Sequence, residues 1–519
     1  MLRQIKSVVS CQLSVVRKGI FLCILSAVLL ILSFPKFNLE FLAWFGFVPL
    51  FLALKNKNKF KAFLFSYLTG VIFWLGTIYW LIHVTLLGLI ILVLYLALYF
   101  AIFGLVLSSI QHLASSIQLF FIPSAWVLLE YLRAHLLTGF PWALLGYSQY
   151  LNLPVIQIAD ITGAWGVSFL VMMVNVTVYS VIGYRLSVIG GKQKFLLPIL
   201  CILVTLTYGY YKIYLTPNTA HRKPIKVSVI QGNIPQELKW DPQAKDFIID
   251  KYIAISREAL KDKPDLIIWP EAAMPVVLEE EPLYYEKVSS LAKQSHTPLL
   301  LGAVTLRDSL YYNSAILVSP EGKLLERYDK LHLVPFGEYI PLRSTLGFLE
   351  TIVPIGDFAR GKEYTTFKLQ APSSKLQARF SVLICFEDLF PELSREFSKR
   401  GADFLVNITN DAWFKKTSSP YQHLQASVFR AVENRVFLIR SANTGVSGFI
   451  APNGKIISLV KDQKGRNIFI SGYNTQGTAP FKENISFYTR HGDIFIWACI
   501  LLVLYGIIKI RRQRQNAKP

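Results

Sequence analysis

Cysteine is scarce in this chain. Five are present among 519 residues, and four of them (Cys11, Cys23, Cys201 and Cys499) lie in or beside apolar segments. The fifth, Cys385, stands alone in a central block of about 270 residues, so that block cannot form an internal disulfide. A thiol that faces an oxidising compartment is at risk of oxidation and needs a reason to be there. We therefore interpret Cys385 as a nucleophile.

The sequence also lacks the patterns of several other kinds of active site. It contains no His-Glu-x-x-His and no Cys/His cluster with zinc spacing, which argues against a metal. It has no glycine-rich phosphate loop, and we expect no cofactor. The stretch 445–448 (Gly-Val-Ser-Gly) lacks the spacing of a Gly-x-Ser-x-Gly elbow, which disfavours a serine hydrolase. We interpret His332 and His423 as solvated or core histidines, with support of a site as the alternative.

Acidic residues are missing from four basic segments. Residues 1–18, 55–61, 185–194 and 509–519 hold sixteen Lys and Arg and no Asp or Glu. If the chain crosses a membrane eight times, all four segments lie on one side, which is the positive-inside pattern of cytoplasmic segments. The formal charge of +21 is then mostly a topology signal, and we expect no nucleic-acid partner. The same pattern predicts that both termini are cytoplasmic and that the central block lies outside the cytoplasm.

Long apolar runs indicate an integral membrane protein. Hydrophobic residues make up 53% of the chain, and runs of about 20 apolar residues can cross a bilayer as helices. The first run could instead be a cleaved signal peptide, but 33–36 (Ser-Phe-Pro-Lys) is a poor cleavage site. We expect seven spans before the central block and one after it: 19–34, 40–54, 62–82, 86–110, 119–137, 164–184, 195–214 and 493–510.

The central block alternates short apolar strands with polar segments that suit helices, which indicates an α/β domain. The expected strands are 225–231, 265–269, 298–304, 314–319, 379–385, 404–409 and 436–441. The expected helices are 246–261, 283–295, 389–400 and 422–434. The predicted domains are a transmembrane bundle (1–216), an α/β catalytic domain (217–475), a linker (476–492), an eighth span (493–510) and a basic tail (511–519).

Reactive side chains follow several of these strands. Cys385 ends one strand, and a strand-to-helix elbow there would expose a nucleophile and aim helix amide groups at it. Glu271 closes another strand, and Lys330 and Glu338 stand in an otherwise apolar segment. A carboxylate base, an ammonium that stabilises an oxyanion and a thiolate that attacks an acyl carbon form a consistent set. Taken singly, the same residues also fit an inert buried cysteine, a surface carboxylate and a solvated lysine paired to Asp329.

The motifs around these residues resemble the nitrilase superfamily, and most closely its membrane-embedded branch, the apolipoprotein N-acyltransferases of Gram-negative bacteria. The shared contexts are Trp-Pro-Glu (269–271), Lys-x-His-Leu-Val-Pro-Phe-Gly-Glu (330–338) and Cys-Phe-Glu (385–387). This resemblance implies a four-layer αββα sandwich on a bundle of about eight transmembrane helices. The likeness covers nearly the whole chain and includes 137–142, 146–149, 231–236, 239–242, 311–314, 410–414 and 442–445.

The resemblance also implies a reaction. A cysteine takes an acyl chain from a phospholipid, usually phosphatidylethanolamine, and passes it from a thioester to the α-amino group of an apolipoprotein's S-diacylglyceryl-cysteine. By motif, Glu271 is the general base, Lys330 the transition-state stabiliser and Cys385 the nucleophile. The implied location is the inner membrane of a Gram-negative bacterium, with the catalytic domain in the periplasm. The other implied site residues are the supporting carboxylates Glu338 and Glu387 and the substrate-binding residues Trp240, Asn313 and Phe386.

One departure and several alternatives stay open. The residue after the nucleophile is often Tyr in the family and is Phe386 here, so a role for its hydroxyl is absent or moved. The apolar stretch 336–358 is either a helix packed on the core or an arm that admits acyl chains.

A membrane-tethered amidase that passes the acyl group to water is the first rival function. A transporter is the second, although the membrane half offers few charges beyond Glu130, Arg133 and Asp160, of which the first two are expected to pair for structure.

Overall fold

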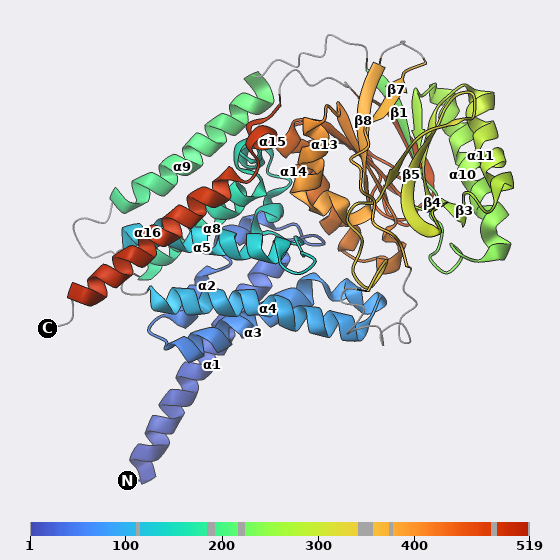
Figure 1. Cartoon of the computed structure of the whole chain (residues 1–519). Coiled ribbons are helices and arrows are strands. Elements are labelled where there is room, and N and C mark those ends of the chain that lie inside the picture. Colours follow the sequence, from blue (N-terminus) through green and yellow to red (C-terminus); the bar gives the residue numbers. More distant parts are fainter. Residues whose placement is uncertain are drawn as a thin grey trace. The chain divides into compact units, whose positions relative to one another are not determined.

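The computed structural model describes residues 2–110, 115–183, 193–215, 224–340, 357–372, 377–478 and 485–516 (Figure 1). The chain divides into two compact units. The helical unit comprises Met1–Leu215 and Asp493–Pro519, and the α/β unit comprises Thr216–Gly492.

The helical unit is built almost entirely from helices. Its α-helices are α1 (Leu2–Leu32), α2 (Val48–Leu54), α3 (Lys59–Thr77), α4 (Leu86–Ser109), α5 (Ser115–His135), α6 (Leu153–Ile156), α7 (Ala159–Thr162), α8 (Ala164–Gly183), α9 (Gln193–Tyr210) and α16 (Ile494–Asn516). Short 3₁₀ turns connect several of them: η1 (Glu40–Trp44), η2 (Tyr79–His83) and η3 (Leu145–Gln149), and a π-helical turn, η4 (Tyr211–Leu215), follows α9.

Within the described residues, five helices are long and apolar enough to cross a membrane: Lys59–Thr77, Leu86–Ser109, Ala164–Ile182, Leu196–Leu215 and Ile494–Arg512. The expected count of about eight is therefore not confirmed. The predicted span 40–54 is not one helix, because it divides into η1 and the seven-residue α2. At about 1.5 Å per residue, a helix of that length reaches only a third of the way across a bilayer core.

Aromatic rings and two buried charged side chains, Glu130 and Arg133, organise the interior of the helical unit. The Trp126 ring lies 4.7 Å from that of Phe47 and 5.1 Å from that of Phe100, measured between ring centroids. Arg133, also on α5 and buried, donates through Nη1 to the carbonyl oxygens of residues 140 and 142 at 2.6 and 2.7 Å. Glu130 accepts from the backbone N–H of residue 145 at 2.6 Å. Both side chains therefore fix the loop that follows α5.

The described residues of the α/β unit form thirteen strands: β1 (Ile225–Gln231), β2 (Leu266–Ile268), β3 (Met274–Val277), β4 (Leu299–Arg307), β5 (Leu310–Val318), β6 (Leu324–Asp329), β7 (Phe367–Gln370), β8 (Gln377–Ile384), β9 (Phe404–Thr409), β10 (Phe437–Ala442), β11 (Gly448–Ile450), β12 (Ile456–Leu459) and β13 (Gly472–Thr478). Its α-helices are α10 (Lys245–Ala259), α11 (Pro282–Ser295), α13 (Pro391–Lys399), α14 (Ser419–Asn434) and α15 (Phe487–His491). Short 3₁₀ turns η5 (Pro242–Ala244), η6 (Leu260–Asp262), η8 (Cys385–Leu389) and η9 (Asp411–Phe414) complete it.

Local sequence explains where these helices begin and end. Proline occupies the first position of α11 and α13, where its missing N–H is not needed. His296 and Arg435 end α11 and α14 in the left-handed conformation, with φ of 51° and 55°. The central parallel strands β1, β2 and β9 are almost wholly buried, and β2 (Leu-Ile-Ile) is accordingly a continuous apolar run.

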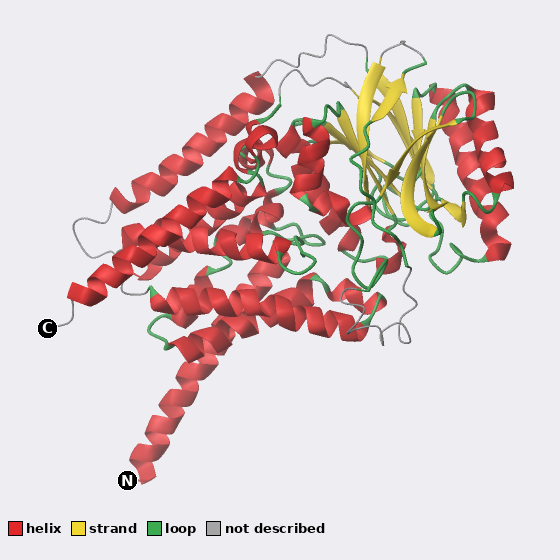
Figure 2. Ribbon diagram, in the orientation of Figure 1, coloured by secondary structure: helices red, strands yellow, loops and turns green. Residues whose placement is uncertain are grey.

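The thirteen strands form two sheets that are stacked between helices. The first sheet has the order β13-β1-β2-β4-β5-β6, with β3 also paired to β4, and the second has the order β12-β11-β10-β9-β8-β7. Helix α10 covers the first sheet, with α11 beside it, and α13 and α14 cover the second (Figures 1 and 2). The two sheets meet face to face, where Ser441 on β10 contacts the carbonyl oxygens of Ile230 and Ile268 at 3.1 Å. The α/β unit is therefore a four-layer αββα sandwich.

The predicted alternation is confirmed for the strands and helices between 225 and 442, with shifted ends. The largest shift is at β5, which begins at Leu310 rather than residue 314. Six strands (β3, β6, β7, β11, β12 and β13) were not expected from the sequence. Most of the apolar stretch 336–358 lies outside the described residues, so the helix and the arm both stay predictions.

The second sheet contains a row of stacked phenylalanines that we expect to dominate its stability. Phe380 on β8 lies between Phe367 and Phe404, with ring centroids 5.1 and 5.2 Å apart, and all three side chains are fully buried. Phe380→Ala should lower the free energy of unfolding by about 3–5 kcal/mol. Chemical denaturation in detergent, followed by tryptophan fluorescence, measures this. Lys368→Ala, an exposed neighbour on β7, is the control, and an equal loss there would contradict the prediction.

Candidate active site

Cys385 lies at the carboxyl end of β8 and has an unusual backbone conformation. Its φ of 55° places it in the left-handed region, which costs a non-glycine residue about 1–3 kcal/mol and persists only where the surroundings hold it. The expected elbow is present, but no α-helix follows at once. Cys385 begins the 3₁₀ turn η8, Phe390 is extended, and α13 starts only at Pro391. Helical backbone angles are disfavoured for the residue before a proline, so the extended Phe390 separates η8 from α13.

Glu271 follows β2 at the same edge of the sandwich, where parallel strands end and sites gather. Its side chain is buried, with 8% exposed. Oε1 accepts a hydrogen bond from Asn313 Nδ2 at 2.8 Å, and Oε2 accepts one from the backbone N–H of Asn410 at 2.9 Å. These two donors hold the carboxylate in place. The alternative of a surface carboxylate is therefore excluded.

Lys330 follows β6 and is 1% exposed, so it is not a solvated lysine. Its Nζ lies 2.9 Å from Glu338 Oε2 and 3.7 Å from Glu271 Oε1. Asp329, the partner in the alternative reading, binds Arg327 at 3.1 Å. Burial lowers the pKa of Lys330, but the charges of Glu338 and Glu271 outweigh burial and hold this pKa above its ordinary value. The residue therefore remains an ammonium.

Asn313 on β5 connects the two carboxylates. Its Nδ2 donates to Glu271 Oε1 at 2.8 Å and to Glu338 Oε1 at 2.7 Å, and the side chain is 6% exposed. Within the described residues its Oδ1 has no hydrogen-bond partner. Glu338 also accepts from the backbone N–H of Val334 at 2.7 Å. One amide thus fixes both carboxylates relative to the ammonium and leaves an acceptor oxygen in the site.

The electrostatic surroundings favour the neutral form of the nucleophile. Burial raises the pKa of the Cys385 thiol, the charge of Glu271 raises it further, and the ammonium of Lys330 opposes both. The net pKa lies above the ordinary value of a thiol. At neutral pH Cys385 is therefore a thiol that needs a base before it can attack.

Glu387 joins the strand of the nucleophile to the segment of the lysine. Its carboxylate accepts from Ile384 N at 2.7 Å, Leu331 N at 2.7 Å, His332 N at 2.9 Å and the hydroxyl of Tyr328 at 2.9 Å. Burial raises the pKa of Glu387 to about 7, against the lowering effects of Lys330 and of these donors. Glu387 therefore holds the chain after β6 beside the end of β8.

The two expected aromatic contacts differ in their surroundings. The Phe386 ring is partly exposed, and its centroid lies 5.7 Å from Lys330 Nζ, within cation–π range. The Trp240 side chain is 48% exposed. Substrate binding by either residue stays a prediction.

Sequence reasoning did not single out Lys239, although it precedes Trp240 in a quoted motif. Lys239 is 5% exposed, and its Nζ donates to the backbone carbonyl of Glu271 at 3.0 Å. Burial lowers its pKa to about 8, with the charges of Glu271 and Cys385 opposing. Nothing in the local residue pattern indicates that this lysine is buried.

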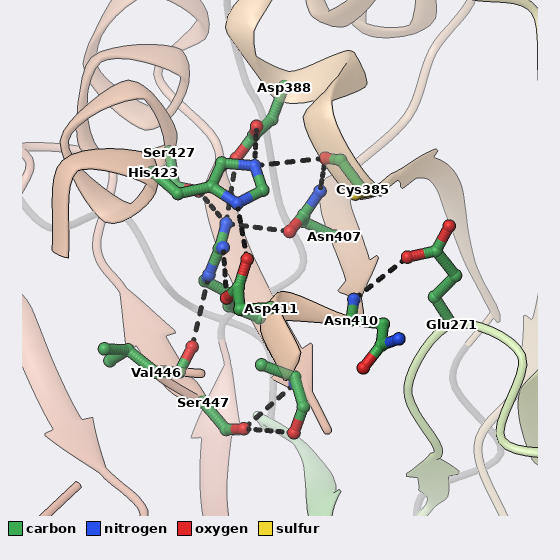
Figure 3. Close-up of polar contacts among 12 residues, drawn as sticks. Glu271, Cys385, Asp388, Asn407, Asn410, Asp411, His423, Ser427, Val446 and Ser447 are labelled. Carbon is green, nitrogen blue, oxygen red and sulfur yellow. Dashed lines mark hydrogen bonds and ion pairs between the residues drawn. The ribbon is translucent and has the colours of Figure 1, made fainter. Parts of the chain in front are cut away.

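A second group beside Cys385 is a histidine for which support of a site was the alternative interpretation. His423, interpreted from the sequence as a solvated or core histidine, is 1% exposed and contacts the carbonyl oxygen of Cys385 (Figure 3). Asn407 Nδ2 donates to the same oxygen at 2.8 Å. No group of three or more His, Cys, Asp or Glu side chains in the described ranges could hold a metal ion.

The chain matches two family models. Residues 26–177 match the apolipoprotein N-acyltransferase N-terminal domain, and residues 226–482 match the carbon-nitrogen hydrolase family. The apolipoprotein N-acyltransferase of Geobacter metallireducens is 41% identical over 93% of this chain and 94% of its own length. That of Pasteurella multocida is 31% identical, again over 93% and 94%. Among solved structures, an amidase from Nesterenkonia sp. with a covalent acetamide moiety at its active-site cysteine is 17% identical, with a TM-score of 0.39, over 53% of this chain and 97% of its own.

Because Glu271 raises and Lys330 lowers the pKa of Cys385, removing either charge should shift this pKa in the opposite direction from removing the other. Glu271→Gln removes a charge that raises the pKa of Cys385, so alkylation of this thiol by iodoacetamide should reach half its maximal rate at a lower pH. Lys330→Met removes a charge that lowers the pKa and should move this midpoint to higher pH. Mass spectrometry of the Cys385 peptide across neutral and alkaline pH measures both shifts.

Glu321→Gln, which changes an exposed carboxylate in the turn between β5 and β6, is the matched control and should leave the midpoint unchanged. Midpoints that move in the same direction in the two site variants would show that these charges do not govern the thiol.

Proposed function

The chain belongs to the apolipoprotein N-acyltransferase family and acylates the amino terminus of lipoproteins, and we propose that it does so through a thioester on Cys385. The donor is a phospholipid, and we propose phosphatidylethanolamine as the lipid. One observation carries the proposal: the thiol of Cys385 lies within electrostatic reach of a buried carboxylate, Glu271, and a buried ammonium, Lys330.

In the first half-reaction, Glu271 takes the thiol proton of Cys385 as the sulfur attacks the ester carbonyl of the phospholipid. The negative charge that develops on the carbonyl oxygen is stabilised by the Lys330 ammonium. The carbon–oxygen bond of the ester then breaks. The proton held by Glu271 passes to the departing oxygen, so lysophospholipid leaves and Cys385 carries the acyl chain.

In the second half-reaction, the α-amino group of the diacylglyceryl-cysteine attacks the thioester carbon. Glu271 takes a proton from this amine, the carbon–sulfur bond breaks, and the same proton returns to the sulfur. The products are an amide and the original thiol, so the cycle follows a ping-pong order.

The supporting residues have distinct parts in this scheme. Glu338 holds Lys330 at 2.9 Å and compensates its charge, so that Glu271 stays available as a base. Asn313 positions both carboxylates, and we propose that its Oδ1 accepts a hydrogen bond from the incoming amine. We propose that the exposed ring of Trp240 and the partly exposed ring of Phe386 contact lipid chains.

We propose a topology in which residues 1–216 and 493–510 form the membrane part and residues 217–475 the catalytic domain. The basic segments support a cytoplasmic position for both termini, with the catalytic domain in the periplasm and the membrane part in the inner membrane. Both substrates are anchored in a bilayer, which gives a reason for joining a thiol enzyme to membrane helices. The rival amidase is not favoured, because the similar proteins that span this chain are N-acyltransferases.

The thioester is directly testable. Purified protein incubated with phospholipid in the absence of acceptor should gain one acyl chain on Cys385, and one lysophospholipid should be released per enzyme. Mass spectrometry should show this adduct, hydroxylamine should remove it, and Cys385→Ser should not form it. Lys330→Met should slow formation of the adduct by about a hundredfold to a thousandfold, because it removes the oxyanion-stabilising charge.

Adding a diacylglyceryl-cysteine peptide to the isolated acyl-enzyme distinguishes transfer from hydrolysis. The acyl chain should appear as an amide on the peptide. Release of free fatty acid at the same rate with and without the peptide would support the amidase instead.

A further inference from the structure

A buried cluster of four charged side chains lies beside the carbonyl group of Cys385 and has no part in the steps above. Asp388, Asp411, His423 and Arg440 are each at most 1% exposed. They come from η8, η9, α14 and β10, and Figure 3 shows the imidazole of His423 between the two carboxylates. When all four are ionised, their charges balance.

Each ring nitrogen of His423 faces an acceptor. Nδ1 lies 3.1 Å from Asp411 Oδ1, and Nε2 lies 2.8 Å from Asp388 Oδ1 and 3.2 Å from the carbonyl oxygen of Cys385. Ionised carboxylates and carbonyl groups only accept hydrogen bonds. A neutral imidazole would turn one lone pair toward such an oxygen. The contacts therefore require a hydrogen on both nitrogens, which is the imidazolium form.

The charges of the cluster support this protonation state. Arg440 Nη1 lies 3.0 Å from Asp388 Oδ2, and Nη2 lies 3.5 Å from Asp411 Oδ2. Burial and Arg440 lower the pKa of His423, but Asp388 and Asp411 outweigh them and hold it above its ordinary value. Burial raises the pKa of each of these two carboxyls, but His423 and Arg440 hold both below their usual range.

The cluster also orients Asn407, the second donor to Cys385. Arg440 Nη1 donates to Asn407 Oδ1 at 2.8 Å, which turns the amide so that Nδ2 reaches the carbonyl oxygen of Cys385 at 2.8 Å. Ser427 donates to Asp388 and accepts from Arg440 at 2.9 Å. Two oriented donors thus hold the carbonyl of a residue whose left-handed backbone needs external support.

We propose that His423, as a doubly protonated imidazolium, is a positioning residue for the nucleophile: together with Asn407 it fixes the carbonyl group of Cys385 and so aims the sulfur at the acyl carbon. The inference rests on the proposed function, because it concerns the same thiol. His423 does not touch the reacting atoms. Its loss should therefore slow formation of the acyl-enzyme and leave phospholipid binding nearly unchanged.

Gly445 is a second position at which a substitution can perturb this cluster. A Cβ at this position would collide with Asp411 Oδ2 and Cγ, so only glycine lets the backbone pass so close to the carboxylate. The glycine lies in the motif 442–445, to which the reaction steps assign no role. Gly445→Ala should displace Asp411 and weaken the hold on the imidazolium without altering His423.

The first test is His423→Gln in the full-length protein, with single-turnover formation of the acyl-enzyme from phosphatidylethanolamine vesicles. The rate should fall about tenfold to a hundredfold, as misaligned reacting groups do, while the apparent KM for phospholipid changes by less than about twofold. His296→Gln, at the exposed left-handed residue that ends α11, is the matched control and should retain the unaltered rate.

The second test is a pH profile, which a merely structural role would not move. Asp388→Asn removes a carboxylate that keeps the proton on His423, so the rate of acyl-enzyme formation should decline at a lower pH on the alkaline side. Gly445→Ala should shift this limb in the same direction. Thermal unfolding midpoints separate both effects from loss of folded protein.

An unaltered rate in His423→Gln, or an alkaline limb that does not move in Asp388→Asn and Gly445→Ala, would overturn the inference. If the unaltered protein still forms its adduct on Cys385, the proposed function survives that result. Absence of any adduct in the unaltered protein would refute the proposed function itself.

Discussion

The buried ammonium of Lys330 is the charge around which the rest of the site is arranged. Burying such a group without partners costs several kcal/mol, so two carboxylates accompany it. Glu338 lies closer, at 2.9 Å, and Glu271 lies at 3.7 Å. The nearer carboxylate compensates the lysine charge, and in the proposed mechanism the farther one accepts a proton. Asn313 keeps this asymmetry by binding both carboxylates through one nitrogen.

Two consecutive acidic residues then fix the nucleophile from opposite sides. Glu387 binds the backbone of Ile384 and of the segment that carries Lys330, so it sets the distance between sulfur and ammonium. Asp388 faces the other way, toward His423. The left-handed backbone of Cys385 lies between these two anchors. A strained residue in such a place persists because its surroundings determine it more than once.

The sequence predicted those parts of the molecule whose signal is local. The buried parallel strand β2 (Leu-Ile-Ile) is a continuous apolar run, and Glu271, Lys330 and Cys385 stand in recognisable motifs. Strand β13 (Gly-Tyr-Asn-Thr-Gln-Gly-Thr) has no alternation of apolar residues that would predict a strand. Its position is set instead by pairing with β1, which is distant in sequence: Ser228 and Thr475, which are in contact, are 247 residues apart. For His423, support of a site was only the alternative to a solvated or core histidine, because its partners come from three other elements and no local motif brings them together. The span at 40–54 failed because hydrophobicity alone does not show where a helix breaks.

A neutral thiol is also less exposed to the oxidation that threatens a lone cysteine in an oxidising compartment. Oxidants and electrophiles react with the thiolate, and burial together with Glu271 keeps Cys385 protonated at rest. In the proposed mechanism the thiolate arises only as its proton moves to Glu271, when an acyl carbon is present to be attacked and Lys330 can stabilise the new oxyanion. Under the proposed mechanism, the environment that raises the pKa of the thiol therefore protects it between turnovers, and Glu271 and Lys330 restore its reactivity when substrate is bound.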